Sequence, residues 1–562
     1  MKTGVKFFTC VTFMTAISIG GIAHAEGFFS NLFGGSKSGT DLKSLLSNVP
    51  ADTSYLMANK QLISEKVAKA HIQRGKDIFA LFQNSDLMKK TSKDAEGAGK
   101  FFIALIEEYV DLLDKDKLED SGLSMQSHYV LYGYEMMPVM RLGVTDKDKL
   151  MAMIKRVEEK SSYKVELTKC GKFDCFESTD PDGKFSVAIA FLDGQLAIAG
   201  FPADKKEGLT KHLIGEAKPK SSYSESNWDS FLKENNYPGY GDGFINLKSA
   251  FNFAKPMIVK NNVSGMDEKT LNGCLAVADQ HFDNLSELVF GTKSFEKDSA
   301  DYEVLFKTSE TVSTMLQTLA NDSNIAQRTE NAIFDYGLNV NFTKLRDALT
   351  QYSSFLIKSG EDNKCSVIQA QEIRKSMGGM AMVMNMGLSQ FNSIYASISD
   401  IQLDDRMQPK KVDAVISLGS NDPAGLISMA SLMAPPLGAL EIPADGSVTK
   451  LPEDLLPSRG AKAPDIFLSR TAKAINIFVG TDKPSLKSHS NEISEIGFSS
   501  MDAGGYIKLI SNVIDAMPKG APQSEAMPDI EMLKKIGEIG GKMRSTTSAD
   551  KRGLAINYNI KY

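Results

Sequence analysis

Two stretches of the chain resemble each other and indicate how it folds. Gly122–Leu150 reads GLSMQSHYVLYGYEMMPVMRLGVTDKDKL, and Gly387–Leu426 reads GLSQFNSIYASISDIQLDDRMQPKKVDAVISLGSNDPAGL. Each begins Gly-Leu-Ser, continues with the alternation of a β-strand, and reaches a Leu-Gly pair followed by Asp146 or Asp422. An aspartate there is expected to cap a helix, because its carboxylate accepts hydrogen bonds from the first turn. The two stretches predict one strand-to-helix unit that occurs twice.

The segments around these stretches also match in the same order. A strand-to-helix step at 54–62 is matched at 338–345, a hairpin at 185–201 is matched at 465–480, and 244–251 is matched at 498–509. Because 562 residues exceed one ordinary core, we expect an α+β fold of two related halves, a tandem duplication, each an antiparallel sheet with helices packed on it. The predicted parts are a signal peptide at 1–25, a flexible N-terminal segment at 26–41, a first repeat domain at 42–307, a helical connector at 308–330 and a second repeat domain at 331–562.

The clearest local prediction is a β-hairpin in FSVAIAFLDGQLAIAGF, residues 185–201. Asp193-Gly194 predicts a two-residue type I′ turn, in which both residues have positive φ. That turn sets the register, so that Phe191 faces Leu196 while Ala190 faces Ala197 on the other side. One face is bulky and the other is nearly flat, and we expect a further layer on both. Earlier in the chain, Asn59 is expected to cap a helix.

The N-terminus has the features of a secretory signal. Lys2 and Lys6 precede an apolar run from Phe7 to Ile22, and Ala23-His24-Ala25 is a cleavage motif. The run is short for a membrane span, and an uncleaved anchor is the alternative. We expect cleavage after Ala25 and location in the periplasm.

The start of the mature chain carries a small apolar cluster. Phe28, Phe29, Leu32 and Phe33 recur at helical spacing and predict a peripheral membrane contact, with a flexible Gly/Ser-rich tether behind them. A disordered N-terminus is the alternative interpretation.

Four cysteines remain after cleavage, and export to an oxidising compartment favours disulfides between them. Cys170 and Cys175 flank a turn, which predicts that they staple a hairpin. Cys274 and Cys365 would then close a loop of roughly 90 residues, which contributes on the order of 4–5 kcal/mol in the chain-entropy model. A small buried thiol is the alternative for Cys274, because its neighbours are apolar at helical spacing.

Several classes of chemistry find no support in the sequence. Lys+Arg 64 against Asp+Glu 70 leaves a net charge of −6, without the basic footprint of a nucleic-acid-binding protein. No zinc-binding spacing or G-x-S-x-G motif occurs, and the mature chain's histidines are scattered, at His71, His128, His212, His281 and His489. The glycine-rich segment 239–243 precedes a predicted strand, so we interpret it as a turn rather than a phosphate loop. We expect no catalytic residues, no metal and no cofactor.

One composition is unusual. The segment SMGGMAMVMNMGL places five methionines close together, at Met377, Met380, Met382, Met384 and Met386. Methionine fills apolar cores, and it also lines grooves that accept varied apolar ligands or partners. A soft Cu(I) site is the third interpretation.

Three short motifs carry a resemblance to a known type of protein. They are Pro50-Ala51-Asp52-Thr53, Pro138-Val139-Met140-Arg141 and the later Asp193-Gly194. With them the chain resembles exported bacterial proteins of a domain-of-unknown-function type. The resemblance implies periplasmic location and α+β architecture, and it brings no catalytic residues.

These observations lead to a ranked set of functional hypotheses. The first is a non-enzymatic protein of the cell envelope that binds or scaffolds an envelope protein or an apolar ligand. The alternative is a periplasmic carrier of lipid or another apolar ligand, held in a groove between sheet and helices. The third is an enzyme with a dispersed site. Nucleic acid is not expected as a partner.

Overall fold

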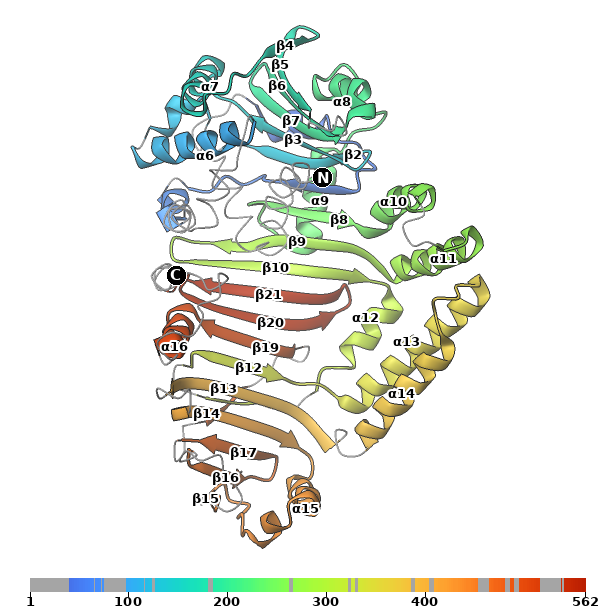
Figure 1. Ribbon diagram of the computed structural model, residues 1–562, viewed down its shortest axis with the longest axis vertical. Helices are drawn as coiled ribbons and strands as arrows, with labels where there is room; N and C mark the ends of the chain where they lie inside the picture. Colours follow the sequence, from blue (N-terminus) through green and yellow to red (C-terminus); the bar gives the residue numbers. More distant parts are fainter. Residues whose placement is uncertain are drawn as a thin grey trace. The chain divides into compact units, whose positions relative to one another are not determined.

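The structure is a computed structural model that combines helices with a large antiparallel sheet arrangement, as expected for an α+β protein (Figure 1). It describes residues 40–64, 66–71, 73–74, 98–115, 117–123, 127–179, 185–261, 266–321, 325–328, 332–385, 390–403, 409–452, 464–480, 486–489, 495–515, 537 and 540–562.

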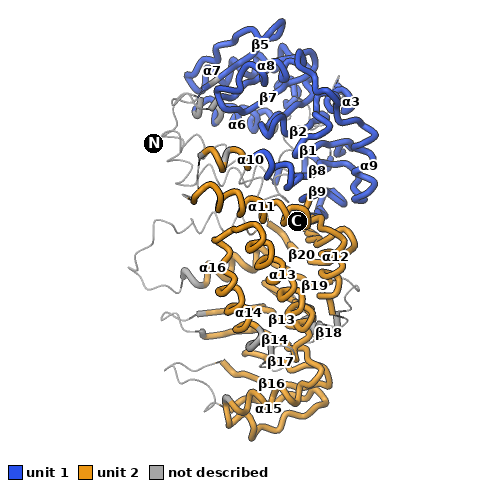
Figure 2. The backbone as a smooth tube through the Cα atoms, turned by 90° about the vertical axis from the view of Figure 1, so that its right-hand side faces the viewer, with its two compact units in different colours: residues 1–253, 287–304 blue, residues 254–286, 305–562 orange. Residues whose placement is uncertain are grey.

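The described residues form two compact units (Figure 2). Unit 1 comprises those of Met1–Phe253 and Glu287–Val304, and unit 2 comprises those of Ala254–Ser286 and Leu305–Tyr562. The segment 254–286 therefore groups with unit 2, although the sequence-based bounds place it in the first domain. In the predicted helical connector, a short helix is followed by a strand.

The elements up to the end of β10 are, in chain order, α3 (Leu42–Leu46), β1 (Tyr55–Ala58), α6 (Ala98–Asp114), η1 (Leu118–Ser121), β2 (Tyr129–Tyr134), β3 (Met137–Gly143), α7 (Lys147–Ser161), β4 (Leu167–Cys170), β5 (Phe173–Thr179), β6 (Phe185–Leu192), β7 (Gln195–Pro202), η2 (Ala203–Lys205), α8 (Lys206–Leu213), α9 (Glu225–Asn235), β8 (Asp242–Asn246), α10 (Leu247–Asn261), α11 (Glu268–Asn284), β9 (Leu285–Phe295) and β10 (Ser299–Thr308). In unit 1 the strands pair antiparallel in the order β4-β5-β6-β7-β3-β2-β1-β8-β9, and β10 pairs with β9.

The later elements are α12 (Glu310–Gln317), β11 (Ile325–Arg328), β12 (Phe334–Leu338), α13 (Phe342–Asn363), α14 (Ala370–Asn385), β13 (Phe391–Leu403), β14 (Pro409–Ser420), α15 (Pro423–Met433), η4 (Pro435–Ala439), β15 (Val448–Lys450), β16 (Ile466–Arg470), β17 (Ala474–Val479), β18 (Leu486–His489), β19 (Glu495–Asp502), α16 (Ala503–Asp515), β20 (Lys542–Asp550) and β21 (Gly553–Lys561). In unit 2 the strands pair antiparallel in the order β15-β16-β17-β14-β13-β12-β19-β20-β21. A separate pair is formed by β11 and β18.

The hairpin of β6 and β7 has the predicted register and the predicted layers. Phe191 lies opposite Leu196, and Ala190 lies opposite Ala197. The bulky face belongs to a core cluster with residues of α6 and α7, such as Phe101 and Val157. The alanine face is also fully buried, on the side of α8. The flat face allows the close approach that was expected from its composition.

The turn type of this hairpin was wrongly predicted. Only Gly194 has positive φ (71°), so the turn is not of type I′. The carbonyl of Gly194 accepts hydrogen bonds from the N–H of Val144 at 2.9 Å and from the hydroxyl of Thr40 at 2.7 Å. These tertiary contacts hold the turn in a conformation that the two-residue sequence did not specify.

Both predicted aspartate caps are confirmed. The carboxylate of Asp146 accepts from the N–H of Lys149 at 3.0 Å, and that of Asp422 accepts from the N–H of Gly425 at 2.9 Å. Asn59 was wrongly predicted to cap a helix. Its buried side chain instead accepts from the N–H of Tyr129 at 2.7 Å, because β1 ends beside β2 there.

Among the described helices, none combines the length and the apolar composition that a membrane span requires.

Candidate apolar binding face

Five neighbouring strands of unit 2 place apolar side chains in register on one face of the sheet. One row runs from Tyr336 on β12 through Ala396 and Ile416 to Ile477 and Leu468. The rows on either side follow the same pairing, because alternate residues of a strand point to the same face. We call this surface the apolar face, and it comprises Phe334, Tyr336, Leu338, Ile394, Ala396, Ile398, Ala414, Ile416, Leu418, Ile475, Ile477, Val479, Ile466 and Leu468. At its edge on β16, Arg470 lies opposite Ile475 and is the charged end of that row.

The apolar face is open to solvent between its edge strand β12 and its middle strand β14. Phe334 is 38% exposed, Ile416 is 39% exposed and Tyr336 is 41% exposed. Between Tyr336 and Ile416 lies Ala396, which is half-buried and leaves the surface flat. Five strands span ~19 Å across the sheet at the usual strand spacing. A contiguous exposed surface of this kind marks an interaction site more often than a scattered apolar residue does.

The opposite face of the same strands is buried and is the more polar of the two. Asp335 accepts a hydrogen bond from the hydroxyl of Tyr395 at 2.6 Å and another from Ser500 at 3.1 Å. Asn476 donates to Ser469 at 3.1 Å. Buried polar groups are usually paired in this way. Aromatic and aliphatic side chains complete this inner layer, on the side where β11 packs, at Tyr395, Val415, Phe478, Phe498, Val448, Phe467 and Leu486.

The helices between β12 and β13 extend away from one end of these strands (Figure 1). Helices α13 and α14 pack on each other, and α13 packs on α11. The Cys274–Cys365 disulfide joins α11 to the segment that follows α13, with Cα atoms 4.6 Å apart. Gly273 makes this approach possible, since a Cβ there would lie 2.0 Å from the carbonyl oxygen of Asn363. The contact with α11 holds the helical pair at the strand ends.

In unit 1, the corresponding face is covered by helices. Leu142 lies four residues before the cap Asp146, as Leu418 lies four residues before Asp422. Leu142 is 1% exposed and packs in the core cluster formed with α6 and α7. In chain order, α6 lies between β1 and β2, as α13 and α14 lie between β12 and β13. The same kind of face is therefore a core in unit 1 and a surface in unit 2.

Most of the predicted methionine cluster lies on α14. Met377 is half-buried and Met380 is 36% exposed. Met382 and Met384 belong to α14, but their side chains are not among those described, and Met386 lies outside the described residues. An apolar groove at these methionines therefore stays a prediction. Phe28, Phe29, Leu32 and Phe33 also lie outside the described residues.

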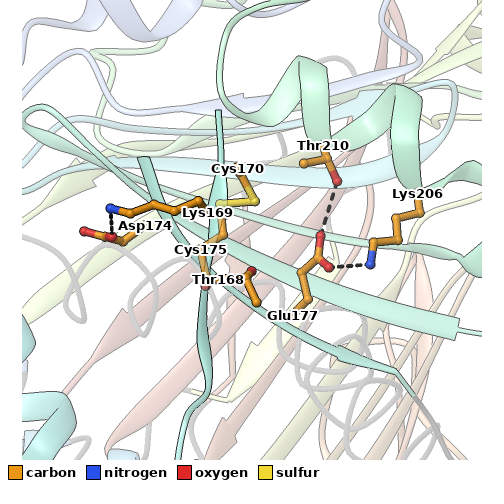
Figure 3. The surroundings of a disulfide bond; sticks show 8 residues. All are labelled: Thr168, Lys169, Cys170, Asp174, Cys175, Glu177, Lys206 and Thr210. Atoms are coloured by element: carbon orange, nitrogen blue, oxygen red, sulfur yellow. Dashed lines mark hydrogen bonds and ion pairs between the residues drawn. A yellow bond between two sulfur atoms is a disulfide. The ribbon is translucent and has the colours of Figure 1, made fainter. Parts of the chain in front are cut away.

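Both predicted cysteine pairs lie at disulfide distance. Cys170 and Cys175 join β4 to β5, with Cα atoms 5.8 Å apart (Figure 3). Beside them, Glu177 of β5 binds Lys206 and accepts a hydrogen bond from Thr210 at 3.5 Å. The disulfide and these contacts tie the hairpin and α8 together, and they serve the packing of unit 1.

A buried polar chain in unit 1 is the arrangement most like a catalytic one. Arg141 donates to the hydroxyl of Tyr132 at 3.2 Å, and that hydroxyl lies 2.8 Å from Nε2 of His212. The ring's Nδ1 lies 3.1 Å from the carbonyl of Ala217. Burial, with the nearby Arg141 charge, lowers the pKa of His212 to about 4. The neutral ring therefore accepts from Tyr132 and donates to Ala217.

This hydrogen-bonded group of Arg141, Tyr132 and His212 has a structural role. Nη2 of Arg141 donates to the carbonyls of His212 and Leu213 at 2.9 and 3.0 Å, at the end of α8. A cation is favourable there because the last carbonyls of a helix lack intrahelical partners. Arg141 and His212 are each 1% exposed, so neither reaches a substrate in this conformation.

A second buried group lies around Asp242, which is fully buried and accepts from the N–H of Thr292 at 2.8 Å. Burial raises the pKa of Asp242 to about 7. Nearby, Glu303 accepts from the hydroxyl of Tyr237 at 3.0 Å and pairs with Lys293 at 3.2 Å. Within the described residues, no group of three His, Cys, Asp or Glu side chains could hold a metal ion.

Comparison of the chain with protein-family models, with curated proteins and with solved structures found no match.

The sequence contains a signal for the apolar face. In β13, Ile394, Ala396 and Ile398 alternate with Ser393, Tyr395, Ser397 and Ser399. Such alternation normally predicts apolar residues inside and polar residues outside. The structure has the reverse arrangement, so the alternation locates the two faces but assigns them wrongly.

Proposed function

We propose that this chain is a non-enzymatic binding protein that holds an apolar chain, such as the acyl chain of a lipid, on the apolar face of unit 2. The observation that carries the proposal is the exposure of Phe334, Tyr336 and Ile416, from the edge strand β12 to the middle strand β14 of an apolar, five-stranded surface. The buried polar groups of unit 1, by contrast, are used in packing. Among the three functional hypotheses from the sequence, the carrier of an apolar ligand fits this geometry best.

The driving force is the removal of apolar surface from water. Full burial of one aliphatic or aromatic side chain contributes about 1.5–3 kcal/mol. Ala396 and Ala414 leave a flat strip beside Ile416, onto which an extended chain can lie against several strands. In unit 1 helices α6 and α7 cover the equivalent surface, whereas in unit 2 a bound ligand would cover it.

The first test is native mass spectrometry of the full chain purified gently from the envelope fraction. A bound lipid or fatty acid, released on unfolding, is the expected result. A co-purified protein without lipid would favour the scaffold hypothesis, in which the apolar face meets an envelope protein. Protein that carries neither, and does not take up a fluorescent C16 fatty acid, would contradict the proposal.

A pair of matched variants locates the ligand. Ile416→Thr keeps a β-branched strand residue but places a hydroxyl at the centre of the apolar face, and it should weaken fatty-acid binding about tenfold, or ~1.4 kcal/mol. Leu167→Thr changes an apolar strand residue of unit 1 that is similarly exposed, at 43%, and should leave binding unchanged. Equal effects of the two variants would place the ligand elsewhere.

We also propose export to the periplasm. The signal-like segment before Glu26 and the two disulfides support this location, because disulfides persist in oxidising compartments. N-terminal sequencing of the protein from the envelope should begin at Glu26. A chain that retains Met1 and has five free thiols, with Cys10 among them, would contradict it.

The two units fit a tandem duplication, which we propose as the origin of the fold. Strand order supports it, because β5-β6-β7-β3-β2-β1-β8-β9 in unit 1 parallels β15-β16-β17-β14-β13-β12-β19-β20 in unit 2. A local detail agrees. Gly243 pairs with Met57 and Gly497 pairs with Leu338, and each glycine is followed by phenylalanine. A Cβ at either glycine would come within 2.7 Å of a carbonyl on the facing strand.

A further inference from the structure

A long uncharged segment follows β14 in unit 2. Residues 423–440 read PAGLISMASLMAPPLGAL and form α15 and η4. Leu432 is 83% exposed, the highest value among the large hydrophobic residues that the structure describes. Pro435 and Pro436 beside it are also exposed. The tip of this segment presents apolar groups to the surroundings.

The corresponding helix of unit 1 is built differently. Helix α7 also begins after an aspartate cap, and it buries Leu150, Met153, Ile154 and Val157 in the core. Its other side carries charged residues such as Lys155 and Glu159, as a helix that faces water should. Helix α15 has no charged residue at any position, so its outer side lacks the feature that suits α7 to solvent.

Two cations lie near the start of α15. The N–H of Ser420 donates to the carbonyl of Lys473 at 2.9 Å, which places the β16–β17 turn beside the helix start. Lys473 is exposed, and Arg470 precedes it at the end of β16. Among the described residues, neither side chain has an ion-pair or hydrogen-bond partner, and Nε of Arg470 is buried without one.

This combination selects one kind of partner. Hydrocarbon strongly disfavours charge, which an uncharged segment avoids, and basic side chains beside it attract anionic headgroups. With 11 residues, α15 is about 16 Å long, which is too short to cross the ~30 Å hydrocarbon core. It suits the bilayer interface instead. A second copy of the chain would cover Leu432 but would leave the two cations unused.

We propose that α15 and η4 dock this protein onto an anionic lipid bilayer, with Leu432 and the adjacent prolines among the acyl chains and with Lys473 and Arg470 against the headgroups. The docking site rests on the composition and exposure of α15 and on the two cations, of which Arg470 lies at the edge of the apolar face, opposite Ile475. It does not require that the apolar face hold a ligand. Docking would bring the protein to the surface from which acyl chains are taken or to which they are delivered.

The test is flotation of the full chain with vesicles of equal parts phosphatidylglycerol and phosphatidylcholine. The wild-type protein should float with them and should bind vesicles of phosphatidylcholine alone at least tenfold more weakly. Leu432→Gln exchanges one good helix former for another and should reduce binding to the anionic vesicles about tenfold. Tyr352→Gln, at an exposed apolar position of α13 that is 48% exposed, should leave binding unchanged. The double variant Lys473→Gln/Arg470→Gln should remove the preference for anionic vesicles.

A reporter variant makes the contact visible directly. Leu432→Trp should show a blue-shifted emission on addition of vesicles and quenching by brominated acyl chains, while the native Trp228, which is fully buried, supplies an invariant background. Absence of wild-type flotation would overturn the proposal, as would Leu432→Gln protein that floats like wild type. A dimer in light scattering that Leu432→Gln disperses, without vesicle binding, would assign the surface to a second copy instead.

Discussion

At the scale of single residues, buried polar side chains that hydrogen-bond to one another and to the backbone stabilise unit 1. The guanidinium of Arg141, part of the Pro-Val-Met-Arg motif, binds the end of α8 and the hydroxyl of Tyr132. The sequence motif indicated a resemblance, and the structure assigns its arginine to packing. Buried polar groups of this kind strongly destabilise a fold when one partner is removed, because the remaining groups stay desolvated.

Arg141→Met should therefore destabilise unit 1 by about 3 kcal/mol or more, since two carbonyls and a hydroxyl lose their donor. The measurement is urea unfolding followed by Trp228, the chain's one tryptophan, which lies in unit 1. Lys211→Met is the matched control on α8, because Lys211 is 53% exposed and pairs with Glu207 on the same helix. A cost below ~1 kcal/mol for Arg141→Met would contradict the structural role.

Two buried groups of unit 1 should oppose each other as the pH changes. His212 has its pKa lowered from 6.5 to about 4, so the unfolded state binds more protons in this range and stability rises with pH. Asp242 has its pKa raised from 3.8 to about 7, so the folded state binds more protons and stability falls with pH. His71, whose pKa burial also lowers, acts in the direction of His212.

Single variants should separate these slopes between pH 4.5 and 6.5. In Asp242→Asn the contribution of the carboxyl group is removed and that of the histidines remains. The free energy of unfolding of unit 1 should then rise with pH, by up to ~1.4 kcal/mol per pH unit for each histidine. His212→Gln leaves the carboxyl effect and should give a flatter or falling profile. Urea titrations monitored by Trp228 at several pH values measure both. Parallel profiles for the two variants would show that neither group titrates as described.

At the scale of elements, the β2–β3 hairpin contains a strained turn. Glu135 and Met136 connect the strands with φ of 46° and 64°, the left-handed pair that a type I′ turn requires. The expected type I′ turn thus occurs here instead of at Asp193-Gly194. The strand register over Tyr129–Tyr134 holds these two residues in a conformation that L-residues with side chains disfavour.

Glu135→Asn with Met136→Gly should stabilise unit 1 by about 1–2 kcal/mol, because asparagine and glycine accept positive φ with little strain. Thermal unfolding followed by Trp228 measures the gain. The control is Gly194→Ala, which introduces a side chain at φ 71° and should destabilise the same unit. An unchanged midpoint for the double variant would indicate that tertiary contacts of the turn offset its strain.

The two disulfides should differ in what they contribute. Cys274–Cys365 closes 91 residues, whereas Cys170–Cys175 closes 5. Cys274→Ala/Cys365→Ala should cost about 4–5 kcal/mol, against about 2 kcal/mol for Cys170→Ala/Cys175→Ala, in the chain-entropy model. Hydrogen exchange measured separately on peptides of α13 and of β5 distinguishes the two. Larger deprotection at β5 than at α13 would contradict the loop-length argument.

At the scale of the whole molecule, the two units have similar strand orders but differ in whether helices cover the corresponding face of the sheet. Unit 1 completes its sheet with α6 and α7 and keeps a closed core around Leu142. Unit 2 ties α13 and α14 to α11 and leaves its apolar face exposed between β12 and β14. Under the proposed duplication, one copy retains the packed form and the other exposes the corresponding face.

Ligand binding should therefore protect the two units unequally. With a C16 fatty acid at 100 times its dissociation constant, amides of β12, β13 and β14 should gain up to about 2.7 kcal/mol of protection. Amides of β6 and β7 should not change. Hydrogen exchange of the full chain is measured with and without the fatty acid, and the wild-type protein freed of fatty acid is the reference. Equal protection of both hairpins would move the binding surface away from unit 2.

Local chemistry determined much of this protein from the sequence alone. The caps at Asp146 and Asp422, the register around Asp193-Gly194 and the cysteine pairs follow from neighbouring residues or from simple pairing. Which face of β13 meets solvent was decided only by the tertiary structure. Alternation of Ile394, Ala396 and Ile398 with serines defines two faces but does not state which one is covered. That choice depends on helices elsewhere in the chain, and the link between α11 and α13 leaves the apolar side exposed.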